Sequence, residues 1–188
     1  LPSFLRLQAN SATNPDAKAA LSNAMARVGA IGHVHRQLYS ANDVRWVDLA
    51  RYLENLMSDL RQAVGQTAAG AELAVKAEPV ATTTDRAVSI GTMVTELVLN
   101  AMKYAYPEGK PGQIRIFCRR GPDDALELPV EDDGVGLQPG TPAKGGGLGE
   151  RIIGMMAQKL HARVERDAAH KGVRTRITIP PAEETPGG

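Results

Sequence analysis

The sequence lacks most features that mark the distinctive classes of protein. Aromatic side chains make up only 4% of its 188 residues, too few for a platform on which nucleic-acid bases stack. Cys118 is the single cysteine, which excludes an intrachain disulfide and a cysteine-based zinc site and favours a reducing compartment. No uninterrupted apolar run approaches the roughly 18 residues that a membrane span needs. We therefore expect a cytoplasmic domain with no membrane segment in this stretch of chain.

An excess of charge of one sign is missing as well. The 22 basic and 21 acidic side chains leave a formal net charge of +1, which argues against a protein that binds nucleic acid over a broad basic face. Glycine and proline are abundant instead, with 19 and 12 residues, and seven of the glycines fall between Gly134 and Gly149. We expect function to concentrate in that glycine-rich segment.

The first 40 residues predict a pair of antiparallel helices. Residues 4–9 have a helical composition, and Asn14-Pro15-Asp16 supplies an N-cap, a proline for the first turn and an acid near the positive helix end. Apolar residues then recur every three or four positions as far as Tyr39. A hairpin with one apolar stripe must pack on a neighbour or on a second copy. Because Leu1 already lies in helical sequence, we expect a longer parent protein.

Residues 48–180 predict a second domain, after a linker at 41–47 and before a tail at 181–188. Helices are expected at 48–64, with Asp48 as the cap, at 85–105 and at 148–160. Strands are expected at 72–76, 113–119, 125–130, 163–166 and 174–179. Helices and largely antiparallel strands in this arrangement indicate an α+β sandwich.

A polar row interrupts the otherwise apolar helix expected at 85–105. Glu96, Asn100 and Tyr104 are spaced four residues apart and share one face, with Lys103 beside them. An asparagine oxygen suits Mg²⁺, a lysine balances phosphate charge, and a carboxylate can orient or deprotonate an attacking group. A solvated helix face is the simpler interpretation of these residues taken alone.

Two glycine-containing segments follow. Asp132-Asp133-Gly134-Val135-Gly136 comes directly after a strand, where glycines let the backbone approach a ligand and an aspartate can accept from an amine, although a hairpin turn explains it equally. Gly145-Gly146-Gly147-Leu148-Gly149 leads into a helix, where free N–H groups suit phosphate. The alternative for this second segment is a flexible linker. It matches neither a Walker A motif nor a Rossmann fingerprint.

In this order and spacing, the three segments resemble the N, G1 and G2 boxes of the GHKL superfamily of ATP-binding domains. That superfamily includes gyrase, heat-shock chaperones, histidine kinases and MutL. Residues 3–8, 26–39 and 47–53 are similar to sensor histidine kinases with the second type of dimerisation and histidine-phosphotransfer domain. The resemblance covers Leu1 to Pro180 and implies a helical hairpin followed by a GHKL-type α/β sandwich.

The resemblance also implies a site that holds ATP and Mg²⁺. Asp132 would bind the adenine amine, Gly134 and Gly136 would shape that wall, and Tyr104 would lie against the base. Asn100 would hold Mg²⁺, Lys103 would contact a phosphate, and Glu96 would act as acid/base or position the attacking group. The remaining assignments are Thr175 beside the adenine-binding aspartate, a lid at 137–144, and the phosphate-facing residues Gly145, Gly147, Leu148 and Gly149.

The function implied is a two-component sensor histidine kinase core. It would transfer the γ-phosphoryl group of ATP to a histidine and then to an aspartate of a response-regulator receiver domain. A homodimer through the hairpin is expected, with a monomer as the alternative. The alternative functions are those of a GHKL ATPase, an anti-sigma-type serine kinase, and a non-catalytic phosphotransfer or docking module.

Two departures from the family pattern matter. The acceptor histidine and its Arg-Val-Lys-Asn-like surroundings are absent, so either they lie upstream of Leu1 or this part of the chain cannot autophosphorylate. We assign His33 and His35 structural or interdomain roles. Pro129 falls inside the strand that leads to Asp132. Because proline cannot donate to the ladder, we expect a bulge or an unpaired position there.

Overall fold

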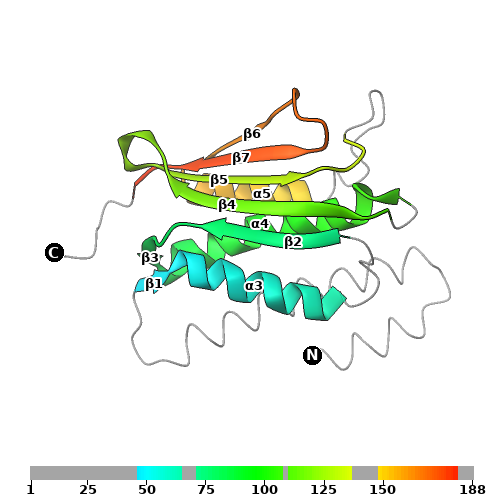
Figure 1. The fold of residues 1–188 in the computed structure, drawn as a ribbon. Helices are drawn as coiled ribbons and strands as arrows, with labels where there is room; N and C mark the ends of the chain where they lie inside the picture. The colour runs from blue at the N-terminus through cyan, green and yellow to red at the C-terminus, as the bar shows by residue number, and fades with distance from the viewer. Residues whose placement is uncertain (1–45, 65–70, 108–109, 137–147, 182–188) are drawn as a thin grey trace.

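The computed structural model describes residues 46–64, 71–107, 110–136 and 148–181 (Figure 1). The helical hairpin expected at 1–40, the lid expected at 137–144, and Gly145 and Gly147 lie outside these residues. The described part is a five-stranded sheet with helices on one of its faces, which confirms the α+β class.

The sheet has the strand order β2-β4-β5-β7-β6. Its strands are β2 (Ala71–Ala77), β4 (Gly112–Arg120), β5 (Leu126–Asp132), β7 (Arg174–Ile179) and β6 (Arg163–Arg166). All neighbouring pairs are antiparallel except β2 and β4, which run parallel. Parallel neighbours need a long crossover, and helix α4 (Thr84–Tyr104) lies in that connection. The central strand of the five is β5, and it ends at Asp132.

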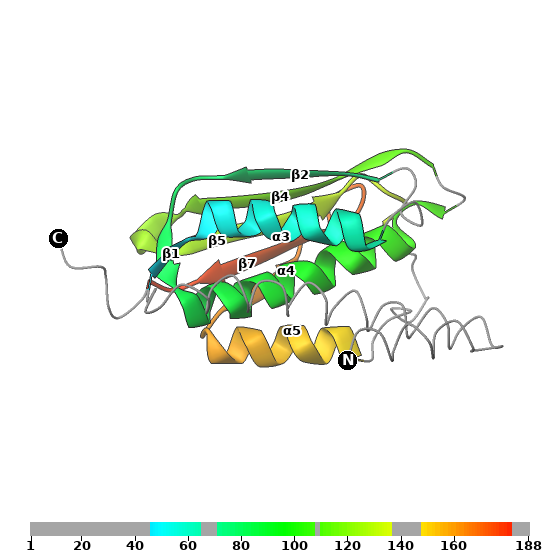
Figure 2. The same ribbon diagram turned by 90° about the horizontal axis from the view of Figure 1, so that it is seen from below.

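Three helices lie side by side beneath the sheet: α3 (Leu49–Val64), α4 and α5 (Leu148–Lys159) (Figure 2). Alternate strand residues point toward them, which is the period expected of a sheet with one buried face. The fully buried side chains on that sheet face are Ile114, Ile116, Leu128, Ile177 and Ile179. No helix in the described ranges is both long and apolar enough to cross a bilayer.

Side chains cap α3 and α4, and the cap of α3 is the predicted Asp48. The N–H of Ala50 donates to Asp48 Oδ1 at 2.9 Å, and the N–H of Arg86 donates to Thr83 Oγ1 at 3.4 Å. The linker prediction needs correction at its end, because Trp46–Asp48 forms β1, which pairs antiparallel with β3 (Ala81–Thr83). Such short strands lack an alternation long enough to reveal them in the sequence.

Pro129 does not produce a bulge. Ile116 opposes Val130 and Arg119 opposes Glu127, so β4 and β5 keep one register on both sides of the proline. Only the pairing at Leu128 and Pro129 is interrupted on the β4 side, while Pro129 still opposes Arg176 of β7. The expectation of an unpaired position is thus confirmed, and the proline leaves the path of β5 toward Asp132 intact.

Candidate functional site

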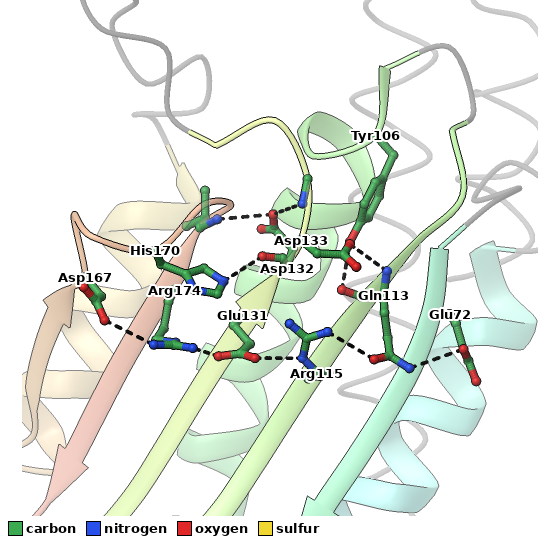
Figure 3. A network of polar contacts seen from close by, with 12 residues as sticks. Glu72, Tyr106, Gln113, Arg115, Glu131, Asp132, Asp133, Asp167, His170 and Arg174 are labelled. Atoms are coloured by element: carbon green, nitrogen blue, oxygen red, sulfur yellow. Dashed lines mark hydrogen bonds and ion pairs between the residues drawn. The ribbon is translucent and has the colours of Figure 1, made fainter.

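Three segments meet at the end of the sheet where β5 finishes: the end of α4, residues 133–136 and the β6–β7 loop at 167–173 (Figure 3). The N–H of Val135 donates to the carbonyl of Ala105 at 3.0 Å. A Cβ on Gly134 would lie 2.3 Å from that same oxygen. A Cβ on Gly136, whose φ is +71°, would lie 2.8 Å from the carbonyl oxygen of Lys171. Only glycine fits such close approaches. The structure therefore brings the N-box and G1-box segments together.

Tyr106 ties the end of α4 to the sheet. Its hydroxyl oxygen lies 2.7 Å from Asp133 Oδ1 and 2.8 Å from the carbonyl of Gln113, while the Gln113 N–H donates to Asp133 Oδ1 at 2.9 Å (Figure 3). Burial raises the pKa of the Tyr106 hydroxyl, and the hydrogen bond to Asp133 adds to that effect. The Gln113 N–H lowers the pKa of Asp133. One carboxylate thus joins α4, β4 and the turn after β5.

Asp132 is buried and held from two sides. Its Oδ1 accepts from the N–H groups of Gly134 at 3.0 Å and Val173 at 3.2 Å, and the side chain is 3% exposed (Figure 3). Burial raises its pKa above the ordinary aspartate value, with those two N–H groups opposing the shift. Within the described part of the chain, every hydrogen bond to this carboxylate ends on Oδ1. Oδ2 remains as the acceptor that a ligand donor can use.

Thr175, predicted beside this aspartate, lies on β7 opposite Val130 of β5. It is 3% exposed and faces the helices. Val173, two positions before Thr175, donates its N–H to the Asp132 carboxylate from the same side of the site. This contact comes from the main chain, so no side-chain pattern could have revealed it. The same holds for Gly172, where a Cβ would lie 2.2 Å from the Asp132 carbonyl oxygen.

The polar row on α4 runs from the interior to the surface. Glu96 is 1% exposed, Asn100 is half-buried, and Tyr104 is 39% exposed. Lys103 is exposed, and its Nζ lies 5.0 Å from the centroid of the Tyr104 ring. The exposed end of this row is the end that meets residues 133–136. Asn100, Lys103 and Tyr104 therefore lie on the part of α4 closest to the G1-box segment.

Helix α5 begins at Leu148, as the third segment predicts. Leu148 is 61% exposed, whereas Gly149 is buried. Arg166 of β6 donates to Glu150 at 2.7 Å, which ties the first turn of α5 to the edge of the sheet. No group of three or more His, Cys, Asp or Glu that could hold a metal occurs among the residues described.

A row of charged and polar side chains crosses the face of the sheet opposite α3, α4 and α5, just behind Asp132. Glu131 receives Arg115 Nε at 2.7 Å and Arg174 Nε at 2.6 Å, and its side chain is 8% exposed (Figure 3). Burial alone would raise the pKa of Glu131, but the two arginines outweigh it and hold the pKa below the usual range. The row continues through Gln113 to Glu72 on one side and to Asp167 on the other. This row of contacts holds the end of β5 in place from the side of the sheet opposite α3, α4 and α5.

Replacing Glu131 with glutamine is expected to destabilise the fold by about 2 kcal/mol at neutral pH, since two charge-assisted hydrogen bonds are weakened. A carboxylate whose folded pKa is lowered stabilises fully above its unfolded pKa, and this contribution is lost as the pH falls through the folded pKa. The gap between wild type and Glu131→Gln should therefore close progressively below pH 4.5, the ordinary glutamate value. Urea unfolding at several pH values measures it.

Glu127→Gln is the matched control for this experiment. Glu127 lies on the same face of β5 and pairs with Arg119 at 2.9 Å, but the side chains are 29% and 59% exposed. Exposed pairs contribute at most about 1 kcal/mol, so this variant should differ little from wild type. Equal losses in the two variants, or a gap for Glu131→Gln that is independent of pH, would contradict the account.

Family models and known proteins match the chain over almost its whole length. Residues 85–183, more than half of the chain, match the model of histidine kinase-, DNA gyrase B-, and HSP90-like ATPases, and residues 1–64 match a histidine kinase model. A blue-light-activated histidine kinase from Erythrobacter litoralis is 25% identical over 187 residues, which cover 97% of this chain and 53% of the relative. The sensor histidine kinase PdtaS of Mycobacterium tuberculosis is 28% identical over 185 residues, covering 94% of this chain and 36% of that protein.

Solved structures give the same result. The histidine kinase domain of an Erythrobacter litoralis blue-light-activated histidine kinase matches with a TM-score of 0.71 at 26% identity, over 95% of this chain and 84% of that one. The chain spans about half or less of the length of the curated relatives. Because this family model matches residues 85–183, the chain belongs to the family of histidine kinase-, DNA gyrase B- and HSP90-like ATPases.

Proposed function

We propose that the chain is the core of a two-component sensor histidine kinase. It binds ATP, transfers the γ-phosphoryl group to a histidine, and the group then passes to an aspartate of a response regulator. One observation carries the proposal: Asp132 is a buried carboxylate whose hydrogen bonds from the described residues all end on Oδ1, so Oδ2 can accept from an amine. The exocyclic amine of adenine is such a donor, and the resemblance of this segment to a G1 box implies that role for Asp132.

The base is held between α4 and the turn after β5. In this proposal Asp132 accepts from the adenine amine while Tyr104, 39% exposed, lies against the ring. Gly134 and Gly136 let the main chain approach the base, and Thr175 completes the pocket next to Asp132. The tie from Tyr106 to Asp133 supports this arrangement, because it keeps the two sides of the site at a fixed distance.

The phosphates extend toward the first turn of α5. Lys103 contacts a phosphate, and main-chain N–H groups of Gly145, Gly147, Leu148 and Gly149 face the phosphate tail. Glu96, one helical turn before Asn100, acts as acid/base or positions the attacking group. Phosphoryl transfer depends mainly on such positioning and on charge neutralisation, which Lys103 and the main-chain N–H groups would supply.

Asn100 is the residue that would hold Mg²⁺. Its carboxamide oxygen is a hard ligand on a half-buried helix position. Mg²⁺ keeps several waters and takes phosphate oxygens as ligands, so one protein ligand suits it, and the described residues offer no cluster of three acidic or histidine ligands. When bound, the ion would neutralise charge on the phosphates.

The rest of the proposal concerns the whole protein. Residues 1–40 would form the dimerisation hairpin, 41–47 the linker and 48–180 the catalytic domain, in a cytoplasmic homodimer that docks a receiver domain. The phosphoacceptor histidine would precede Leu1, within about two helical turns of an Arg-Val-Lys-Asn-like stretch.

Incubation of the full-length protein with Mg²⁺ and ATP labelled on the γ-phosphate tests the proposal. A label on the protein that acid removes and alkali does not is expected for a phosphohistidine kinase. Hydrolysis without a protein label would indicate an ATPase instead, and an alkali-labile, acid-stable label would indicate a serine kinase. Absence of ATP binding would leave only a docking module.

A further inference from the structure

We propose that His170 is a positioning residue for recognition of the nucleotide base: its ring holds the main chain of Asp132 and thereby aims the carboxylate. The inference rests on the proposed function, because it gives Asp132 the base as its ligand. His170 itself would touch neither the nucleotide nor the transferred phosphate. No feature of the family motifs in the sequence points to this residue, which lies 38 positions after Asp132.

The β6–β7 loop that carries His170 is held in shape from β7. Asp167 Oδ1 accepts from the N–H of Ala169 at 3.1 Å, and the His170 N–H donates to the Asp167 carbonyl at 3.2 Å. Asp167 Oδ2 lies 3.3 Å from Arg174 Nη1 and 2.7 Å from Arg176 Nη2. These contacts form a tight turn whose first residue is anchored to two arginines of β7. The turn therefore presents the His170 ring in a fixed place.

The ring reaches the main chain of Asp132. His170 Nε2 lies 2.9 Å from the Asp132 carbonyl oxygen (Figure 3). A carbonyl oxygen only accepts, so Nε2 carries the hydrogen. Gly172 packs against the same carbonyl, where a Cβ would come within 2.2 Å, so nothing larger than glycine allows the loop this close.

The next contacts of the loop go to Asp132 as well. The Asp132 N–H donates to the Val173 carbonyl at 2.9 Å, and the Val173 N–H donates to Asp132 Oδ1 at 3.2 Å. The loop thus binds the amide, the carbonyl and one carboxylate oxygen of a single residue. Fixing both peptide groups of Asp132 fixes the direction of its side chain, and a binding group must be held within about 0.5 Å to select its ligand.

The test compares two substitutions of His170. His170→Leu removes the donor and keeps an apolar side chain of similar reach. His170→Gln keeps a hydrogen-bond donor, because the glutamine amide nitrogen carries hydrogens and can occupy nearly the place of Nε2. ADP and GDP binding by calorimetry, with the full chain, reports affinity without phosphoryl transfer. Ala168→Leu, at an exposed position in the same loop, is the control for an added apolar side chain.

His170→Leu is expected to weaken ADP binding about tenfold and to reduce the preference for ADP over GDP, while His170→Gln and Ala168→Leu stay near wild type. Hydrogen exchange of the Val173 and Gly134 amides, the donors to Asp132 Oδ1, should quicken in His170→Leu without any nucleotide. Unchanged affinity and exchange in His170→Leu, or equal losses in the leucine and glutamine variants, would overturn the inference. If wild type binds neither nucleotide, the proposed function fails and the base-recognition role falls with it, whatever the exchange rates show.

Discussion

Asp132→Asn is expected to weaken ATP binding on the order of a hundredfold while leaving the fold intact. The carboxamide oxygen must take the place of Oδ1, because that position accepts from the N–H groups of Gly134 and Val173. The amide nitrogen then occupies the place of Oδ2 and points hydrogens at the adenine amine. A hydrogen bond to a charged acceptor becomes a clash of two donors, a loss of about 3 kcal/mol, and each 1.4 kcal/mol is tenfold in affinity.

The same reversal changes base preference. Guanine carries a carbonyl oxygen where adenine carries its amine, so the asparagine nitrogen would donate to guanine. The affinity for GTP should therefore rise while the affinity for ATP falls. The ratio of ATP to GTP affinity should then fall by more than the ATP affinity does. Calorimetric titration with both nucleotides measures this ratio. Asp85→Asn, which removes an exposed carboxylate paired with Lys159 at 2.8 Å, is the charge-matched control.

Thermal unfolding separates a binding defect from a folding defect in this variant. Burial raises the pKa of Asp132, so the folded state bears a cost for keeping this carboxylate charged. Asparagine removes that charge and still accepts from both N–H groups, which predicts an unchanged or slightly raised melting temperature. A variant that loses ATP affinity only because it melts early would contradict this account, as would one that keeps wild-type ATP affinity.

The elements with long patterns could be predicted from the sequence, and short or non-local ones could not. Helices α3, α4 and α5 agree with their predicted ranges within a few residues, because each has an apolar period and a capping residue or glycine at its start. β1 and β3 are three residues each and offer no period. The parallel pairing of β2 with β4 depends on how α4 packs on the sheet, which strand composition does not encode.

The candidate site divides in the same way. The sequence singles out Asp132, Gly134, Gly136, Asn100 and Lys103 because they stand in short motifs with residue types that suit the proposed ligand. His170 and Gly172 act on Asp132 from a loop that the chain reaches only after α5 and β6, so their importance becomes visible only in three dimensions. Tyr106 is similar, since its partner Asp133 lies 27 positions away. The residues that position the site are thus harder to predict than the residues that form it.

Asn100→Ala is expected to lower phosphoryl transfer on the order of a hundredfold. If its carboxamide oxygen holds Mg²⁺, the substitution leaves the ion bound by phosphates and water alone, and a shift of about 1 Å in the reacting groups can cost that much in rate. ATP binding should weaken far less, because the contacts of Asp132 with the base remain. The initial rate of protein labelling and the ATP affinity, each measured with and without Mg²⁺, give both quantities.

The ion itself supplies the decisive control, because removal of Mg²⁺ and removal of Asn100 form a thermodynamic cycle. Two changes that abolish the same interaction are not additive, whereas independent changes add within about 0.5 kcal/mol. Withdrawal of Mg²⁺ should therefore cost Asn100→Ala less ATP affinity than it costs wild type, and the difference should equal the loss that the substitution causes in the presence of the ion. If Asn100 instead contacts the nucleotide directly, the variant would show the full Mg²⁺ effect on top of its own loss.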